Sequence, residues 1–239
     1  MPRVLITAPA RQEPKIFKEY RDSIDRLVIP DGVTVDTYYV VNNCPELLPC
    51  LHPGDHYIEF DTNESYSKTH NDHIWSRSNM TMMETLRNMT IDYALIHGYD
   101  YWFSIDTDLV LHPLTLQTLL EADKDIVSEI FWSVSKDIHR WCNAWMYDQG
   151  SGMLPEWNTP GLYQCGMTGA CTLVKRKVLT AGVNYTNIPN IHYLYGEDRF
   201  FCVRAAVHGF ELWVDTHYPA THLYTEMEYI KYMNQKGAK

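Results

Sequence analysis

The amino-acid sequence predicts an α/β fold in which helices flank a mostly parallel central sheet. Short apolar runs alternate with stretches of helical periodicity through roughly the first half of the 239 residues. Strands that alternate with helices usually pair in parallel, because each helix carries the chain back across the sheet. The second half is less regular, but no internal repeat and no low-complexity linker separates it from the first. We therefore expect a single domain with two lobes over residues 1–239.

The first two strands and the helix between them follow from residue type and spacing. Residues 3–8 form a short apolar run, and residues 33–41 are rich in the β-branched and aromatic side chains that favour strands. Residues 13–27 have the period of a helix. Their apolar side chains recur about one helical face apart, at Ile16, Tyr20, Ile24 and Leu27.

A long helix dominates the middle of the chain. Residues 45–75 contain Pro, Gly, His and Asn throughout, so we expect mainly loop there, with a short strand near residues 57–60. The helix that follows ends at Gly98 and carries one apolar stripe. This stripe consists of Met82, Leu86, Met89, Tyr93 and Ile96.

The remaining elements are shorter. Pro113 is expected to open a helix that reaches Leu120. Further strands are predicted at residues 101–105, 125–132, 170–174 and 211–214, and further helices at residues 175–179 and 197–208. The polar tail after Tyr232 is expected to be loose.

Charge and hydropathy indicate which kinds of partner and which cellular location to expect. The formal net charge is −10, whereas proteins that follow a phosphate backbone usually carry a basic face, so a nucleic-acid partner is disfavoured but not excluded. No run reaches the roughly 18 apolar residues of a membrane-spanning helix. The first residues turn polar too soon for a signal peptide, so we expect a cytoplasmic protein.

The six cysteines contain no C-x-x-C pair and are expected to be free, mostly buried thiols.

The strongest functional signal is Asp106-Thr107-Asp108, directly after the apolar run 101–105. Ligands of open α/β sheets bind beyond the carboxyl ends of the strands. Two carboxylates one residue apart can both reach one divalent cation there, and their hard oxygens suit Mg²⁺ or Mn²⁺. An Asp-x-Asp string alone is weak, but the apolar residues on both sides of this copy strengthen it.

The segment from Tyr99 to Pro113 resembles the metal-binding segment of GT-A fold glycosyltransferases related to the large family 2. The resemblance implies a nucleotide-binding half over about residues 1–108 and an acceptor-binding half over about residues 109–239. It also implies that Asp108 ligates the metal, and that Asp106 contacts the ribose or a metal-bound water. The metal would bridge the two phosphates of a nucleotide.

A second segment, Gly196 to Ala205, resembles the Glu-Asp helix start of inverting members of these enzymes. The resemblance implies that Asp198 is the general base for the acceptor hydroxyl and that Glu197 holds a sugar hydroxyl. Acidic residues at a helix N-terminus are also favoured by the helix dipole alone, so both interpretations stay open.

A late histidine resembles the third metal ligand of many GT-A enzymes. His222 matches its place, and His217 is the competing candidate five residues earlier. A nitrogen ligand would shift the preference from Mg²⁺ toward Mn²⁺.

The donor nucleotide is expected at the ends of the first two strands. The resemblance places the base against Thr7, Ala8, Pro9 and Arg11, with Thr107 also in the donor site. At Asn42, many relatives carry an Asp that accepts a bond from uracil; Asn42 still offers a carbonyl oxygen, so the base stays open between UDP and GDP donors.

Two further residues complete the expected donor site. Arg87, on the long helix, resembles an arginine that faces the nucleotide in relatives, although a solvated helix face is as good an interpretation. Gly169 lies in a small-residue stretch, Gly161 to Val174, that resembles the backbone under the donor sugar, where glycine allows close approach.

These features together predict a metal-dependent, hexosyltransferase-like enzyme. It would move a sugar from a UDP- or GDP-sugar to a glycan or another hydroxyl acceptor, with inversion if Asp198 is the base. Retention stays open if no base reaches the acceptor. The aromatic stretch from Trp141 to Trp157 is a candidate acceptor platform, although most aromatic side chains are simply core.

Three alternatives stay open. A sugar-1-phosphate nucleotidyltransferase shares the sheet and the metal, but it would carry a Gly-rich loop after the first strand, and Thr7 to Arg11 contains no glycine. A non-catalytic nucleotide-sugar or glycan-binding protein would not need both Asp108 and Asp198. An enzyme that glycosylates nucleic-acid bases would be a subtype, against which the acidic charge argues mildly.

Overall fold

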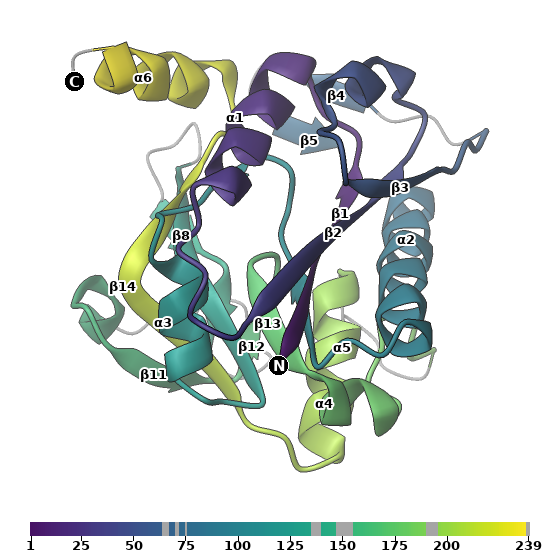
Figure 1. The fold of residues 1–239 in the computed structure, drawn as a ribbon, viewed down its shortest axis with the longest axis vertical. Coiled ribbons are helices and arrows are strands. Elements are labelled where there is room, and N and C mark those ends of the chain that lie inside the picture. The colour runs from purple at the N-terminus through teal and green to yellow at the C-terminus, as the bar shows by residue number, and fades with distance from the viewer. Residues whose placement is uncertain are drawn as a thin grey trace.

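A ten-stranded twisted sheet runs through the molecule and separates two layers of helices (Figure 1). The structure is a computed structural model that describes residues 1–63, 67–69, 72–74, 76–134, 140–146, 155–189 and 196–237. Across the sheet, the strands are β11 (Leu162–Cys165), β14 (Leu212–His222), β8 (Ile126–Val134), β13 (Thr172–Lys175), β6 (Tyr101–Ser104), β1 (Arg3–Ala10), β2 (Thr34–Val41) and β3 (His56–Glu59).

Short strands extend this sheet or pair beside it. β7 (Leu109–Val110) pairs with β14, and β9 (Arg140–Cys142) pairs with β8. Two separate pairs are β4 (Ser67–Thr69) with β5 (Asp72–Ile74) and β10 (Ala144–Trp145) with β12 (Met167–Thr168).

From β11 to β3, four of the seven neighbouring strand pairs are parallel, which confirms the predicted fold class. β6, β1, β2 and β3 pair in parallel, and so do β8 and β14. β13 is antiparallel to both of its neighbours, and β11 is antiparallel to β14. β1 is buried on both faces after its first residue, which is why its sequence is almost continuously apolar.

Helices cover both faces of the sheet. α2 (Arg77–Ile96), α4 (Arg176–Thr180) and α5 (Glu197–Val207) pack on one face, against side chains such as Leu5 and Trp102. α1 (Pro14–Asp25) and α3 (Thr115–Glu121) pack on the other, against side chains such as Ile6 and Phe103. Two 3₁₀ helices, η1 (Pro45–Cys50) and η2 (Pro155–Asn158), lie in the connections.

The long helix begins earlier than its apolar stripe indicates. Ser76 and Asn79 form a capping box in which each side chain bonds the backbone N–H of the other residue. The cap satisfies N–H groups that the first helical turn leaves without partners, so the helix can begin at Arg77. This extra turn brings polar and sulfur-containing side chains to the end of the sheet.

The last strand and the C-terminal tail differ from the prediction. β14 continues to His222, beyond the predicted end at residue 214, because a shift of register between Asp215 and Ala220 lets a polar stretch stay paired. The tail is not loose, because α6 (Glu226–Gly237) packs Tyr229 and Tyr232 against a small apolar cluster. An ion pair of 2.6 Å from Lys236 to Glu19 of α1 also holds it.

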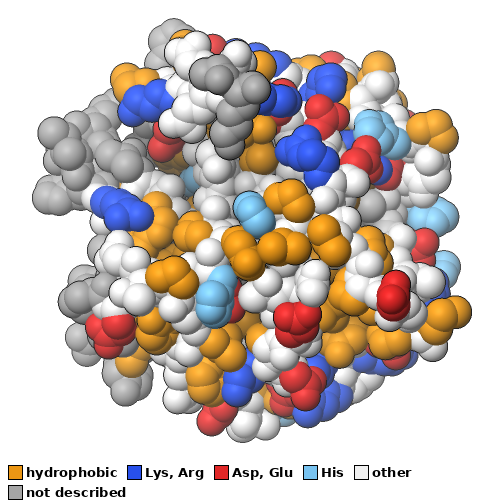
Figure 2. Space-filling view, turned by 60° about the vertical axis from the view of Figure 1, so that its left-hand side comes forward, with side chains coloured by type: hydrophobic (Ala, Val, Ile, Leu, Met, Phe, Trp, Pro, Cys, Tyr) orange, Lys and Arg blue, Asp and Glu red, His pale blue; other side chains and the backbone are white. Residues whose placement is uncertain are grey.

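The surface carries charges of both signs. On the face in Figure 2, a band of hydrophobic side chains crosses the middle, and acidic and basic side chains are interspersed around it. Within the described ranges, no helix is both long and apolar enough to cross a membrane. All six cysteines are free and five are buried, as the sequence predicts.

Candidate active site

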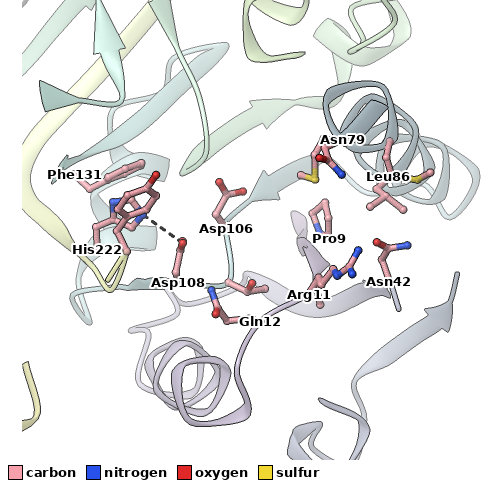
Figure 3. Close-up of a pocket in the computed structure, with 15 residues that line it drawn as sticks. Pro9, Arg11, Gln12, Asn42, Asn79, Leu86, Asp106, Asp108, Phe131 and His222 are labelled. Carbon is pink, nitrogen blue, oxygen red and sulfur yellow. Dashed lines mark ion pairs between the residues drawn. The ribbon is translucent and has the colours of Figure 1, made fainter. Parts of the chain in front are cut away.

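A cavity of about 200 Å³ lies beyond the carboxyl ends of β1, β2 and β6. Its lining comes from these strand ends, the first turns of α2, the Asp-x-Asp turn and the end of β14 (Figure 3). In this view Asn42 and Leu86 lie at one end of the cavity, and Asp108 and His222 lie at the other. The cavity therefore lies at the edge of the sheet where ligands of α/β folds bind.

The Asp-x-Asp turn is held against the last strand of the sheet. Asp106 accepts a bond from the Leu109 N–H through its carbonyl, which closes the turn. Leu109 then pairs with His222 across β7 and β14. As a result, the Oδ2 atom of Asp108 lies 3.4 Å from the Nε2 atom of His222 (Figure 3).

The His222 ring is oriented by a residue that the sequence analysis did not single out. Its Nδ1 atom lies 2.7 Å from the Oγ atom of Ser133, a buried residue of β8. The ring also meets Phe131 edge-on, with centroids 4.8 Å apart. These contacts leave Nε2 as the ring nitrogen that faces Asp108. Burial disfavours the charged ring, but the Asp108 carboxylate outweighs burial and raises the pKa of His222.

His217 is in a different environment. Its Nδ1 atom lies 2.9 Å from the Asp215 carboxylate, and its side chain is 43% exposed. It lines neither the cavity at the strand ends nor the adjoining cavity around Asp198. Of the two candidate histidines, only His222 lies beside Asp108.

Arg87 links the Asp-x-Asp turn to the start of α5. Its side chain is almost completely buried; Nη2 donates to Asp106 Oδ1 at 2.8 Å, and Nε donates to Glu197 Oε1 at 3.2 Å. Nη1 donates to the Ser104 hydroxyl at 3.0 Å. Burial alone would lower the pKa of the guanidinium, but the carboxylates of Asp106, Asp198 and Glu197 raise it well above its usual value. A permanent charge therefore holds two predicted site residues in fixed positions.

The carboxylate of Asp198 packs directly on Gly169. A β-carbon on Gly169 would lie 2.3 Å from both the Cγ and the Oδ2 atoms of Asp198, far inside contact distance. The next residue, Ala170, has a φ of 66°, a conformation that costs energy for a residue with a side chain. The carboxylate of Asp198 thus occupies space in the turn before β13 that any side chain at position 169 would fill.

Asp198 is an unusual carboxylate. Its Oδ1 atom is buried and has no hydrogen-bond partner in the described part of the chain. Burial raises its pKa, Arg87 lowers it, and Glu197 and Asp106 raise it again, to about 8. Desolvation and like charges thus give Asp198 a much greater proton affinity than an ordinary carboxylate has.

A second cavity, of about 370 Å³, surrounds Asp198 and adjoins the first. Both cavities include Met83, Asp106, Phe131, His222 and Tyr224 in their walls. Its other walls come from α2, β9, β10, the Gly169 turn and the start of α5. Together the cavities bring the Asp-x-Asp turn and the Glu-Asp helix start to one continuous site.

Asn42 presents a hydrogen-bond acceptor to the first cavity. Its Nδ2 atom donates to the Phe60 carbonyl at 2.7 Å, and its backbone N–H donates to the Ala10 carbonyl. A carbonyl can only accept, so the amide nitrogen must face Phe60, which leaves Oδ1 for a ligand.

Most of the other predicted donor-site residues line one of the two cavities. Pro9, Arg11, Asp106 and Thr107 line the first cavity, whereas Gly169 and Arg87 line the second. Ala8 lines neither, because alternation along β1 turns its side chain into the core beneath α1. Thr7 is likewise buried.

The aromatic stretch divides between the site and the core. Trp141 and Trp145 are partly buried and line the second cavity, whereas Trp157 is 1% exposed and belongs to the core. Residues 147–154 of this stretch lie outside the described part of the chain. Several lining residues belong to no motif in the sequence: Asn79, Met80, Met83, Phe131, Ser133, Asn143 and Tyr224.

No group of three or more His, Cys, Asp or Glu side chains in the described ranges is arranged to hold a metal ion by itself. Asp108 and His222 are the pair that the structure brings together. One carboxylate oxygen and one imidazole nitrogen suit a cation whose other ligands come from phosphate oxygens and water.

The fold is similar to that of solved glycosyltransferases. TarS 1–349 from S. aureus in complex with UDP superimposes with a TM-score of 0.54 at 11% identity, over 92% of this chain and 59% of that one. TarS 1–349 alone gives a TM-score of 0.52 at 11% identity, with the same coverage of both chains.

A second solved structure comes from another organism. The catalytic domain of Drosophila β1,4-galactosyltransferase 7, in complex with xylobiose, gives a TM-score of 0.51 at 11% identity, over 95% of this chain and 73% of that one.

Similarity to known proteins is found in the structure and not in the sequence. No protein-family model and no curated protein matches the sequence. The chain spans 59% of the length of TarS 1–349, and at 11% identity the likeness concerns the fold. By its architecture, this chain has a GT-A-like α/β fold, similar to that of these glycosyltransferases.

Proposed function

We propose that this protein is a metal-dependent glycosyltransferase that moves a sugar from a nucleoside-diphosphate sugar to a hydroxyl acceptor, with inversion. The observation that carries the proposal is the continuity of the two cavities. The Asp108–His222 pair lies in the wall of one, Asp198 lies in the wall of the other, and Asp106 belongs to both. A donor whose diphosphate lies at the first pair would direct its sugar toward Asp198.

The first cavity suits a nucleoside diphosphate. Pro9, Met82 and Leu86 supply apolar surface for a base, and the Asn42 Oδ1 atom accepts a bond from a ring N–H. Uracil and guanine carry such a ring N–H, whereas the ring nitrogens on the pairing edges of adenine and cytosine are acceptors. This favours a UDP- or GDP-sugar donor, and the UDP complex of TarS supports the former.

Asp108 and His222 would hold a Mn²⁺ or Mg²⁺ ion. When bound, the ion supplies positive charge that neutralises the departing diphosphate. Ser133 keeps the Nε2 atom of His222 directed toward Asp108, and β7 and β14 keep the two residues that would hold the ion side by side. Asp106 is held by Arg87 at one oxygen and can accept a ribose or water hydrogen bond at the other.

Asp198 would act as the general base. Its carboxyl group lines the second cavity and can accept the proton of an acceptor hydroxyl there. As that proton moves to Asp198, the acceptor oxygen bonds to the anomeric carbon and the bond to the diphosphate breaks. Attack from the face opposite the diphosphate inverts the anomeric centre. Glu197, fixed by Arg87, is placed to accept a bond from a sugar hydroxyl.

Catalysis explains Asp198 better than simple binding does. The Oδ1 atom of Asp198 is buried without a partner among the described residues, and two acidic neighbours lie close to it; this lowers stability, and a protein that only binds sugars does not need it. The xylobiose complex of β1,4-galactosyltransferase 7 supports a glycan as the acceptor.

The proposal is tested by release of nucleotide from a panel of UDP- and GDP-sugars, with Mn²⁺ or with a chelator. We expect release from at least one donor with Mn²⁺ and loss of release with the chelator. Asp108→Asn should abolish transfer, whereas Asp198→Asn should abolish transfer and still bind nucleotide. Turnover that survives both the chelator and Asp108→Asn would show that the site works in another way.

A further inference from the structure

Four aromatic side chains line the second cavity together with its acidic residues. Phe131, Trp141, Trp145 and Tyr224 all line it. The Trp141 and Tyr224 rings meet almost at right angles, with centroids 6.4 Å apart. Tyr224 in turn packs on His222, with centroids 5.1 Å apart. The aromatic wall is therefore continuous with the proposed metal ligands.

Strand pairing holds the two tryptophans in place. Trp141 lies opposite Ser133 in the β8–β9 pair, so both side chains lie on the same side of the pair and line the same cavity. Trp145 lies opposite Met167 in the β10–β12 pair and packs partly against the core. Both rings are thus preorganised, which reduces the entropy lost when a ligand stacks on them.

The polar groups beside Asp198 are acceptors. Asp106 and Glu197 contribute carboxylates to the wall, and carboxylates only accept; Asp198 is a third such acceptor once it is deprotonated. The Asn143 amide has no donor to spare, because Nδ2 donates to the carbonyls of Glu129 and Gly169. Its Oδ1 atom accepts from the Phe131 N–H. A ligand that fits these groups must bring its own donors.

The charge of this wall disfavours an anionic ligand. Its described residues include three acidic side chains, of which Asp198 is charged only when deprotonated. The cationic groups of the wall are already paired, since Arg87 is bonded to Asp106 and Glu197, and His222 lies beside Asp108. Unit charges of like sign repel across a few ångströms, more strongly where water is excluded. A phosphate or carboxylate on the acceptor would be repelled at this wall.

From this combination we infer that the acceptor is a neutral pyranoside, which stacks an apolar sugar face on Trp141 and Trp145 and donates hydroxyl bonds to the carboxylates. A pyranose offers apolar C–H faces with hydroxyl donors at its edge, which matches a cavity with aromatic walls and a few polar groups. A lipid alcohol would leave the carboxylates without partners, and an acidic sugar or a phosphodiester would meet repulsion. This inference rests on the proposed function and specifies its acceptor.

The first test compares acceptors with the native enzyme. Neutral alkyl pyranosides, the matching uronic-acid glycosides, sugar phosphates and simple alkanols are offered with the donor that the nucleotide-release assay identifies. We expect transfer to neutral pyranosides, with anionic analogues of the same sugar at least about tenfold poorer in kcat/KM. Preference for an anionic acceptor or an alkanol overturns the inference. Donor hydrolysis without transfer to any neutral pyranoside also overturns it, while the proposed function stands.

The second test replaces the rings. Trp141→Ala and Trp145→Ala should each raise the acceptor KM by about threefold to tenfold, and Trp→Phe at the same positions should restore part of the loss. Trp213→Phe is the matched control, because Trp213 lies on β14 beneath Lys124 and lines neither cavity. An unchanged acceptor KM in both alanine variants contradicts the stacking.

A binding measurement covers the case in which an alanine variant does not fold. Titration of the UDP-loaded native protein with a neutral pyranoside should change the tryptophan fluorescence. The Trp213→Phe protein should respond in the same way, and the Trp141→Phe, Trp145→Phe double variant should lose most of the response. No response in the native protein overturns the inference. Absence of both donor turnover and nucleotide binding would refute the proposed function itself.

Discussion

The carboxylate of Asp198 lies on the bare α-carbon of Gly169, in a space where a β-carbon would approach the carboxyl carbon to 2.3 Å. The two residues come from different segments, the turn before β13 and the first turn of α5. The absence of a side chain at position 169 therefore sets the position of the proposed base.

Replacement of Gly169 by alanine should move Asp198 and impair transfer. We expect kcat to fall by about 100-fold, because a displacement near 1 Å is enough to disturb a reacting geometry. Nucleotide affinity should change little, since the base-binding end of the first cavity is remote from this contact. Gly237→Ala, where an added β-carbon meets nothing within 4 Å, is the control. A Gly169→Ala enzyme with normal kcat would show that Asp198 need not stay where it is.

The raised pKa of Asp198 predicts a pH dependence of the reaction. A general base acts only when it is deprotonated, and burial with two acidic neighbours raises the pKa of this group to about 8. The value of kcat/KM for the donor should therefore rise with pH, reach half of its maximum near pH 8 and level off about one pH unit higher. A profile that is already flat from pH 5 upward would contradict a base with this pKa.

Loss of Arg87 should lower the stability of the folded protein. Arg87→Met would leave Glu197 buried and Asp106 partly buried without their shared cation. We expect a loss of about 3 kcal/mol in the free energy of unfolding, measured by denaturant titration. Arg87→Lys should recover only part of it, since a lysine cannot bond both carboxylates and Ser104 in the same way.

The control for this prediction is on the same helix. Arg77→Met changes an exposed arginine in the first turn of α2 and should shift the free energy of unfolding by about 0.5 kcal/mol or less. Equal losses of unfolding free energy in the Arg77 and Arg87 variants would mean that the buried ion pairs of Arg87 do not stabilise the fold.

Ser133 is predicted to act through His222. Ser133→Ala removes the partner of the Nδ1 atom, so the ring loses its fixed orientation, and Mn²⁺ affinity in the presence of UDP should fall by about tenfold. Calorimetry or electron paramagnetic resonance measures this directly. Ser133→Thr should restore the affinity, because it keeps the hydroxyl.

Ser128→Ala serves as the comparison for Ser133. Ser128 is buried on the same strand and its hydroxyl bonds Thr172 at 2.7 Å, away from both cavities. This variant should bind Mn²⁺ normally. If both serine variants lose Mn²⁺ equally, the effect comes from the strand and not from the Ser133 hydroxyl.

The sequence predicts the position of the Asp-x-Asp turn well, because that position depends on local pattern. An apolar run followed by two carboxylates must place them at the end of a buried strand, and β6 does so. The partnership of Asp108 with His222 is less predictable. It requires β14 to stay paired through eight further residues after Val214, with a polar sequence and a shift of register.

Arg87 shows where helical periodicity alone stops being informative. A charged residue on a helix usually faces water, and nothing nearby in the sequence indicates otherwise. It is buried because Asp106 and Glu197, 19 and 110 residues away, supply compensating charge. Met82 and Leu86 show the converse, since an apolar stripe predicts burial but does not distinguish the core from the wall of a cavity.

The most direct measurement is a crystal structure with Mn²⁺ and UDP bound, with the ion located by its anomalous scattering. The account predicts one ion in contact with Asp108 Oδ2, His222 Nε2 and the diphosphate, and the uracil N3–H bonded to Asn42 Oδ1. An ion bound elsewhere, or a diphosphate distant from both Asp108 and His222, would contradict it.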